Sequence, residues 1–169
     1  TRIASDWLRA APTQAVMAAL APAQPLFVGG CVRDALMGRA SVDIDIAVIT
    51  PPERTMALAD SAGLKAAPTG VDHGVVTIIV DGAPFEVATL RRDVATDVRR
   101  AVVAFTDRIE EDAGRRDFTI NALYADAAGE VIDPLGEGLS DLAARRIRFI
   151  GDAGQRLRED YLRILRFFR

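Results

Sequence analysis

One segment of the sequence constrains the fold more than any other. Apolar residues run through 75–80 and again through 85–90, and Asp81-Gly82 lies between the two runs. An Asp-Gly pair suits the tight two-residue turn of a β-hairpin, because both residues tolerate positive φ angles. The segment therefore predicts an antiparallel hairpin, and the fold must contain a β-sheet.

Helix and strand patterns alternate along the rest of the chain. Helices are predicted at residues 12–20, 32–37, 50–62 and 139–144 and from residue 152 onwards, and strands at 25–28, 42–49 and 146–150. The polar segment 93–111 is expected to be a mobile loop, whereas the apolar segment 118–125 fits either a strand or a helix. Interleaved helices and strands with one hairpin predict an α+β domain, in which a mixed sheet is flanked by helices.

Composition excludes several classes of protein. Half of the residues (50%) are hydrophobic, which is enough for a sizeable core, and no apolar run approaches the roughly 20 residues of a membrane span. The net charge of -3 gives no overall signature of a nucleic-acid-binding protein, although Arg is concentrated in 91–100 and 145–169. The single cysteine, Cys31, leaves no intrachain disulfide, so we expect a soluble cytoplasmic protein. The last predicted helix ends uncapped with an apolar face, which indicates a piece of a longer protein.

Two carboxylates stand close together in the sequence. Asp43 and Asp45 alternate with apolar residues on a predicted strand, so their side chains are expected on one face. A divalent cation such as Mg²⁺ would relieve their repulsion, since this ion is commonly held by one or two carboxylates plus substrate phosphates. Two such ions can clamp the attacking and leaving oxygens of a phosphoryl transfer. The alternative is an edge strand whose Asp side chains are solvated.

A double-glycine turn precedes the carboxylate pair. Gly29-Gly30 follows a predicted strand and opens a predicted helix. Glycine lets the backbone approach a ligand closely, and the first N–H groups of a helix can bind phosphate. Arg33 adds a forked cation within the first helical turn. Together with Asp43 and Asp45, these residues predict a nucleoside triphosphate site, although an ordinary tight turn is the alternative for the glycines alone.

Three charged residues recur at a spacing of three in the last predicted helix. Asp160, Arg163 and Arg166 would form one slowly turning stripe. A carboxylate accepts a hydrogen bond from an exocyclic amino group, and an Arg donates to a ring nitrogen or carbonyl. Asp160 and Arg163 would therefore accept cytosine and adenine and reject uracil and guanine. The alternative is a solvated helix with salt bridges between neighbouring turns.

Five motifs in this order resemble those of one enzyme family. They occupy residues 29–34 with 38–39, residues 43–47, residues 85–91, residues 115–123, and residues 159–163 with Arg166 and Arg169. With these motifs the sequence is similar, from Leu26 onward, to the class II tRNA CCA-adding enzymes and the bacterial poly(A) polymerases.

The resemblance implies a fold and an activity. The fold is a polymerase-β-like nucleotidyltransferase head, residues 1–150, followed by the start of a helical neck, residues 151–169. The activity is template-independent addition of C and A residues to the 3′ end of tRNA from CTP and ATP, at a site with two Mg²⁺ ions and with release of pyrophosphate. The alternatives are a poly(A) polymerase or A-adding enzyme, and a non-catalytic RNA-binding module. Such a module would have no use for a repelling Asp pair.

The resemblance also implies roles for individual residues. Arg116 would contact the triphosphate, because the family has a nucleotide-binding Arg in that place. Arg166 and Arg169 would join Asp160 and Arg163 in the nucleotide site.

A third carboxylate is expected beside the Asp pair. Glu86, on the hairpin strand, would bind metal or take the proton from the attacking hydroxyl group. The alternative for Glu86 is a salt bridge to Arg91 or Arg92. Asp117 is the second candidate for a catalytic carboxylate, and its alternative role is to cap the element that follows it.

Overall fold

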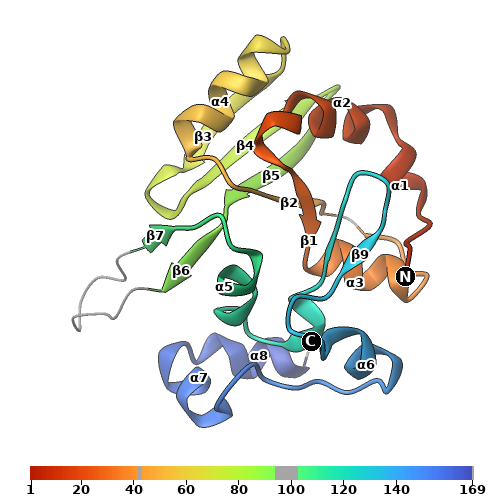
Figure 1. The fold of residues 1–169 in the computed structure, drawn as a ribbon, viewed down its shortest axis with the longest axis vertical. Helices are drawn as coiled ribbons and strands as arrows, with labels where there is room; N and C mark the ends of the chain where they lie inside the picture. Colours follow the sequence, from red (N-terminus) through yellow and green to blue (C-terminus); the bar gives the residue numbers. More distant parts are fainter. Residues whose placement is uncertain (42, 94–102, 169) are drawn as a thin grey trace.

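A mixed β-sheet forms the centre of the molecule (Figure 1). The computed structural model describes residues 1–41, 43–93 and 103–168, and within them seven strands are hydrogen-bonded in the order β3-β4-β5-β2-β1-β8-β9. The strands are β1 (Leu26–Val28), β2 (Asp45–Val48), β3 (Lys65–Gly70), β4 (Val75–Val80), β5 (Ala83–Thr89), β8 (Tyr124–Ala125) and β9 (Val131–Ile132). Only β2 and β5 are parallel among these neighbours, so the predicted α+β class is confirmed.

The predicted hairpin is formed by β4 and β5. Their register pairs Val80 with Ala83, which leaves Asp81 and Gly82 as the two-residue turn. Both turn residues have positive φ, 51° and 80°, as the Asp-Gly pair predicts. Alternate residues of β4 are buried, beginning with Val76, so one face of the hairpin belongs to the core.

Helices cover the sheet and extend the molecule at one end (Figure 1). They are α1 (Asp6–Arg9), α2 (Ala11–Ala19), α3 (Gly30–Leu36), α4 (Pro52–Ser61), α5 (Ile109–Gly114), α6 (Gly138–Ala143), α7 (Ala153–Glu159) and α8 (Leu162–Phe168), with short 3-10 turns at Ala21–Ala23, Val71–His73 and Thr119–Asn121. Helices α2 and α4 pack against each other and against β4. The main core lies between these helices and the sheet, and it includes the fully buried Phe27, Ile46 and Ile78.

Several predicted boundaries are wrong. The segment 93–111, expected to be a loop, contains β7 (Val103–Phe105) and the start of α5, and β7 pairs with β6 (Arg91–Asp93) in a second, two-stranded sheet. Residues 94–102 of that expected loop lie outside the described part of the chain. The strand predicted at 146–150 is reduced to one isolated bridge, between Phe118 and Phe149. The predicted helix 32–37 starts two residues earlier, at Gly30.

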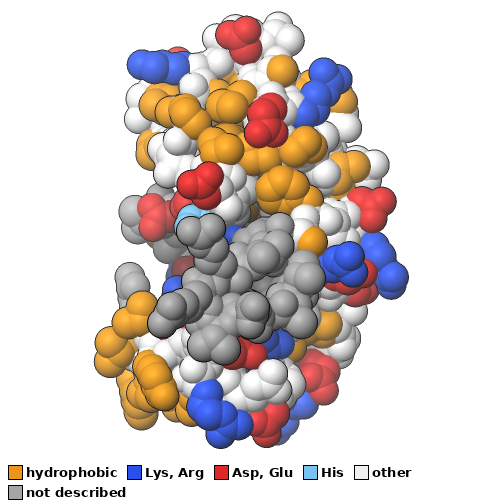
Figure 2. Space-filling model, turned by 90° about the vertical axis from the view of Figure 1, so that its left-hand side faces the viewer, with side chains coloured by type: hydrophobic (Ala, Val, Ile, Leu, Met, Phe, Trp, Pro, Cys, Tyr) orange, Lys and Arg blue, Asp and Glu red, His pale blue; other side chains and the backbone are white. Residues whose placement is uncertain are grey.

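The C-terminal end carries an exposed apolar surface. Helices α7 and α8 lie at the end of the molecule opposite α4, and Figure 2 shows hydrophobic side chains gathered at that lower end. Exposure reaches 70% at Tyr161, 68% at Leu165 and 81% at Phe168. None of the described helices is long and apolar enough to cross a membrane.

Candidate functional site

The chain turns sharply where β1 ends and α3 begins. Gly29 occupies the turn with φ 77° and ψ −126°, a backbone conformation that residues with side chains rarely adopt. Its N–H donates to the carbonyl of Leu123 over 3.0 Å, which ties the turn to the chain before β8. A Cβ atom at Gly29 would lie 3.6 Å from Nη1 of Arg116 and 3.6 Å from the carbonyl oxygen of Asn121. Glycine therefore brings the start of α3 directly beside Arg116.

Two carboxylates are neighbours across the parallel strands. The Cα atoms of Asp45 on β2 and Glu86 on β5 are register partners. Asp45 is half-buried, whereas Glu86 and Asp43 are exposed. Asp43 precedes β2, so the prediction that both Asp residues lie on one strand is wrong, because strand pairing begins only at Asp45. Glu86 forms no ion pair within the described residues, and the alternative of a salt bridge to Arg91 or Arg92 is not found there.

The charges around Asp45 favour a cation. Burial raises the pKa of the Asp45 carboxyl above its ordinary value, and the negative charge of Glu86 raises it further. Arg116 opposes this rise and Asp43 adds to it. A raised carboxyl pKa means that the charged form is not fully compensated by its surroundings. A divalent cation would provide the missing positive charge.

The donor groups fit a particular kind of metal site. Within residues 1–41, 43–93 and 103–168, no three side chains of His, Cys, Asp or Glu form a ready-made cage for a metal ion. Mg²⁺ does not need such a cage, because it retains water and commonly uses one or two carboxylates plus substrate phosphates. Asp43 and Asp45 therefore fit a Mg²⁺ ion that binds together with a nucleotide, and they do not fit a structural metal held by protein alone.

Arg116 is fixed beside the glycine turn by a buried network. Its Nε and Nη2 donate to Oδ2 of Asp112 over 3.1 Å and 2.9 Å, and its Nε also lies 3.1 Å from the Tyr124 hydroxyl. The Tyr124 hydroxyl donates to the same carboxylate over 2.6 Å. The guanidinium carbon of Arg116 lies 5.3 Å from the centre of the Tyr124 ring. The structure thus brings Arg116 to the place where a triphosphate contact was predicted, next to Gly29.

Asp112 was not among the predicted site residues. This residue is 1% exposed and pairs with both Arg115 and Arg116. The available signal was spacing: Asp112 precedes the two Arg residues by three and four positions, the separations that bring helical neighbours together. It was missed because α5, which brings Asp112 beside the two Arg residues, begins inside the segment 93–111 that was expected to be a loop.

Arg33 is close to the glycine turn and is held by two neighbouring side chains. Its Nε donates to Oδ1 of Asp34 over 2.8 Å, and its Nη1 donates to Oδ1 of Asn121 over 2.7 Å. A Cβ at Gly30 would lie 3.8 Å from Nη2 of Arg33. A guanidinium has five N–H donors, so Nη1 and Nη2 each keep one N–H that could reach a phosphate while these contacts persist.

The predicted base-reading stripe does not lie on one helix. Asp160 separates α7 from α8, with extended φ and ψ of −155° and 105°, and its Oδ1 accepts from the N–H of Leu162 over 2.9 Å. Arg163, in α8, donates through Nη1 to Oε2 of Glu159 and to the carbonyl of Arg156, each over 2.8 Å. The prediction of one continuous helix from residue 152 onwards was wrong. The helix is interrupted at Asp160, whose side chain caps the start of α8.

Arg166 links α8 to the rest of the site. Its Nη1 lies 3.4 Å from Oδ2 of Asp117, a weak ion pair with an exposed Arg side chain. Oδ1 of Asp117 accepts from the N–H of Phe118 over 2.8 Å and from Nδ2 of Asn121 over 3.2 Å. Asp117 therefore supports the turn at Phe118, but it does not cap the 3-10 turn at Thr119–Asn121, whose N-cap residue is Phe118. Arg169 lies outside the described residues.

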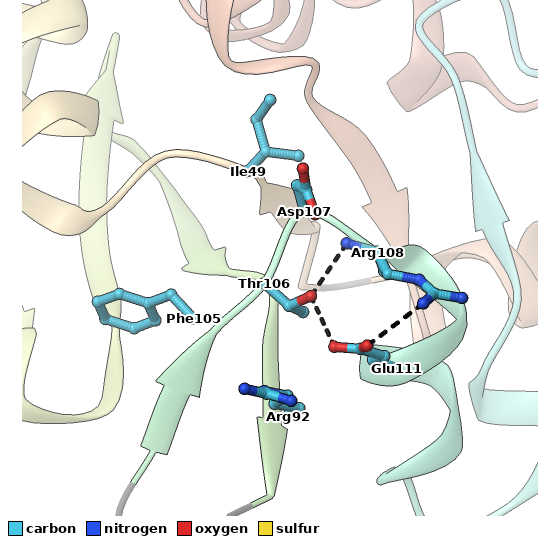
Figure 3. Close-up of a pocket in the computed structure, with 7 residues that line it drawn as sticks. All are labelled: Ile49, Arg92, Phe105, Thr106, Asp107, Arg108 and Glu111. Carbon is cyan, nitrogen blue, oxygen red and sulfur yellow. Dashed lines mark hydrogen bonds and ion pairs between the residues drawn. The ribbon is translucent and has the colours of Figure 1, made fainter.

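A shallow groove of about 470 Å³ lies between the two-stranded sheet and α5 (Figure 3). It is lined by Ile49, Arg92, Phe105, Thr106, Asp107, Arg108 and Glu111. Thr106 donates to Glu111 over 2.7 Å, and Arg108 pairs with Glu111 at 3.8 Å. None of the predicted site residues lines this groove, and it lies beyond the end of β2 opposite to Asp45.

Comparisons with known proteins agree on one family. Residues 26–148 match the family described as the poly A polymerase head domain. The chain is 46% identical over 145 residues to a CCA-adding enzyme of Streptococcus pyogenes serotype M2 (strain MGAS10270), which covers 85% of this chain and 35% of the relative. It is 44% identical over 142 residues to the mitochondrial CCA tRNA nucleotidyltransferase 1 of Danio rerio, covering 83% of this chain and 33% of that protein. The chain thus spans about a third of the length of these curated relatives.

Solved structures show the same fold. The CCA-adding enzyme of Bacillus stearothermophilus in complex with CTP superimposes with a TM-score of 0.82 at 36% sequence identity, over 96% of this chain and 38% of the other. A tRNA nucleotidyltransferase complexed with a primer tRNA and an incoming ATP analog gives a TM-score of 0.68 at 30% identity, over 90% of this chain and 42% of the other.

Proposed function

Because the chain belongs to the poly A polymerase head domain family, we propose that it is the catalytic head of a tRNA nucleotidyltransferase. The proposed reaction adds C and A residues to the 3′ end of tRNA, uses CTP and ATP, and releases pyrophosphate. Residues 1–150 would form the head, and residues 151–169 the start of a helical neck. The proposed place of action is the cytoplasm.

One observation carries this proposal. The Gly29 turn, the Arg116 guanidinium and the Asp45 carboxylate come together although they are far apart in the sequence, and Asp45 is close enough to Arg116 for its pKa to respond. A glycine turn and a cation can hold a triphosphate, and a carboxylate that lacks a counter-charge can hold Mg²⁺. This combination supports phosphoryl transfer better than RNA binding alone.

The residues divide the work of the reaction. The 3′ hydroxyl oxygen of the tRNA forms a bond to the α-phosphorus, the bond from that phosphorus to the bridging oxygen of pyrophosphate breaks, and the hydroxyl proton passes to a carboxylate. Asp43 and Asp45 would hold Mg²⁺, which supplies charge stabilisation when bound. Glu86, exposed beside Asp45, is our candidate for the proton acceptor. Arg116, Gly29 and Gly30 would hold the triphosphate.

Base selection is proposed for the neck helices. Asp160 and Arg163 would read the edge of cytosine or adenine, and Arg166 and Arg169 would complete the nucleotide site. Arg163 is held by Glu159, and Arg166 reaches Asp117 at the head, which supports a position of α8 next to the nucleotide site. Oδ1 of Asp160 accepts from the N–H of Leu162, and its Oδ2, which has no hydrogen-bond partner among the described residues, would be free to accept from the base.

The proposal is tested by incorporation of labelled nucleotides. Purified protein is incubated with tRNA that lacks its 3′ CCA end and with each labelled nucleoside triphosphate in turn, in the presence of Mg²⁺. We expect incorporation of CTP first and of ATP after it, and no incorporation of UTP or GTP. Incorporation of ATP alone would replace the CCA assignment by an A-adding or poly(A) activity. RNA binding without any incorporation would favour the non-catalytic module.

A further inference from the structure

Asp112 uses both of its carboxylate oxygens in a buried position. Oδ2 accepts from Arg116 and from the Tyr124 hydroxyl. Oδ1 accepts from Nε and Nη2 of Arg115 over 2.9 Å and 2.6 Å, and from the backbone N–H of Arg91 over 3.2 Å. One side chain in α5 therefore joins the start of β6, the Arg pair and β8.

The contacts leave one edge of the Arg116 guanidinium available. Nε and Nη2 face Asp112, and the ring of Tyr124 lies against the guanidinium at 5.3 Å. In the part of the chain that the structure describes, Nη1 makes no hydrogen bond, and it is one of the two atoms nearest to a Cβ built at Gly29, at 3.6 Å. The side chain of Arg116 keeps 21% exposure, so it is not sealed in the core.

We propose that Asp112 is a positioning residue, which holds the Arg116 guanidinium so that Nη1 faces the triphosphate of an incoming nucleotide at the Gly29 turn. The inference rests on the proposed function, because it takes the triphosphate as the ligand of Arg116. Tyr124 assists by donating to the same carboxylate oxygen. Asp112 itself contacts no substrate and acts only through Arg116.

The electrostatics explain why a charged carboxylate is needed. Burial alone would raise the pKa of Asp112, but the positive charges of Arg116 and Arg115 and the hydrogen bond from Tyr124 outweigh it and lower the pKa below its ordinary value. An Asn side chain has nearly the same shape but no charge, and one of its two polar atoms is a donor. Asp112→Asn would therefore release Arg116 with little change in packed volume.

The chain provides a matched control in Asp141. This carboxylate is also 1% exposed, and it accepts from a hydroxyl, Thr119 Oγ1 at 2.7 Å, and from an Arg, Arg148 Nη2 at 2.8 Å. It connects α6 to the 3-10 turn at Thr119–Asn121 and contacts none of the proposed site residues. Asp141→Asn therefore measures the structural cost of neutralising a buried, paired carboxylate.

The experiment compares Asp112→Asn, Tyr124→Phe and Asp141→Asn with the wild type. CTP affinity is measured by titration calorimetry in Mg²⁺, folding by thermal unfolding, and order at Arg116 by the NMR signal of its Nε–H. We expect Asp112→Asn to weaken CTP binding by about tenfold to a hundredfold, the scale of a lost charge-assisted hydrogen bond, and to remove the Nε–H signal. Tyr124→Phe should weaken binding less, and Asp141→Asn should lower the unfolding midpoint without changing CTP affinity.

Each other outcome contradicts a defined part of the account. Equal CTP affinity in Asp112→Asn and Asp141→Asn would overturn the positioning role. If Asp112→Asn does not fold, Tyr124→Phe decides: wild-type CTP affinity together with an unchanged Nε–H signal would overturn the network. A wild type with an ordered Arg116 but no affinity for CTP would contradict the proposed function and the triphosphate part of the inference, while the contact between Asp112 and Arg116 would stand.

Discussion

At the scale of single residues, Asp45 and Asp112 are two partly or fully buried carboxylates whose pKa values shift in opposite directions. Burial works to raise the pKa of both carboxyls. At Asp112, Arg116 and Arg115 more than offset burial, whereas at Asp45 the charge of Glu86 adds to it. The protein therefore satisfies the charge of Asp112 by itself and leaves the charge of Asp45 to a ligand.

Replacement of Asp45 by Asn is expected to stabilise the protein and abolish its activity. The substitution removes a half-buried charge that Glu86 and Asp43 repel, so the thermal unfolding midpoint without Mg²⁺ should rise by a few degrees. Nucleotide incorporation should be lost, because an amide is a poor ligand for Mg²⁺. Unfolding curves and incorporation assays check the two effects, and a lower midpoint would argue against uncompensated charge at Asp45.

The stability of the metal-free protein and its Mg²⁺-dependent binding of nucleotide should change with pH in opposite directions. Because the folded-state pKa of Asp45 is raised, ionisation of this group lowers the stability of the metal-free protein as the pH rises through that pKa. Mg²⁺ binding requires the ionised carboxylate, so Mg²⁺-dependent nucleotide binding should weaken as the pH falls through the same pKa. Unfolding curves and CTP titrations at a series of acidic pH values would measure how stability and CTP affinity depend on pH. Both dependences should become weaker in Asp45→Asn.

At the scale of elements, the turn between β1 and α3 places backbone and cation together. Gly29→Ala should cost about 1–3 kcal/mol of folding free energy, since φ 77° with ψ −126° lies outside the backbone regions open to L-residues. It should also weaken CTP binding, because the new Cβ would stand 3.6 Å from Arg116 Nη1. Thermal unfolding and CTP titration measure the two losses.

Gly63 offers the control for this substitution. It follows α4 with φ 73°, and no atom lies within 4 Å of its built Cβ. Gly63→Ala should therefore also lower stability, because its φ is positive, and should retain the CTP affinity of the wild type. Equal affinity in both Ala variants would show that the Gly29 turn is only structural.

Elements that local sequence determines were predicted well, and those set by distant partners were not. The hairpin depends on alternation and an Asp-Gly turn, so the residues of β4 and β5 were sufficient to predict it. β6, by contrast, is held by contacts with Asp112 and with β7, which its own three residues do not reveal. For the same reason the sequence pointed to Asp45 and Arg116 as site residues but could not show that Asp112 and Tyr124 hold Arg116 in place.

At the scale of the whole molecule, α5 lies between the sheet and the C-terminal helices α7 and α8 (Figure 1). Arg156 connects α7 to α5 and to Ile150, because its Nη2 donates to the carbonyl of Gly114 over 2.6 Å and its Nε to that of Ile150 over 2.9 Å. The rings of Phe118, Phe149 and Phe167 pack nearby with centroids 4.8–6.2 Å apart.

Loss of the Arg156 connection should affect base selection more than triphosphate binding. In Arg156→Ala the helices α7 and α8 should become sensitive to limited proteolysis, and discrimination between CTP and UTP should fall, while binding of inorganic triphosphate stays unchanged. Arg158→Ala is the matched control, since Arg158 is exposed and has no ion pair among the described residues. A variant that loses triphosphate binding together with discrimination would contradict the division between head and neck.

The most direct test of the central claim is a CTP titration at a series of Mg²⁺ concentrations, in the wild type and in Asp45→Asn. A site built from the Gly29 turn, Arg116 and Asp45 predicts that CTP affinity rises with Mg²⁺ in the wild type and becomes nearly independent of Mg²⁺ in the variant. CTP affinity that responds equally to Mg²⁺ in both proteins would contradict the assignment of Asp45 to the metal and of this place in the fold to the nucleotide.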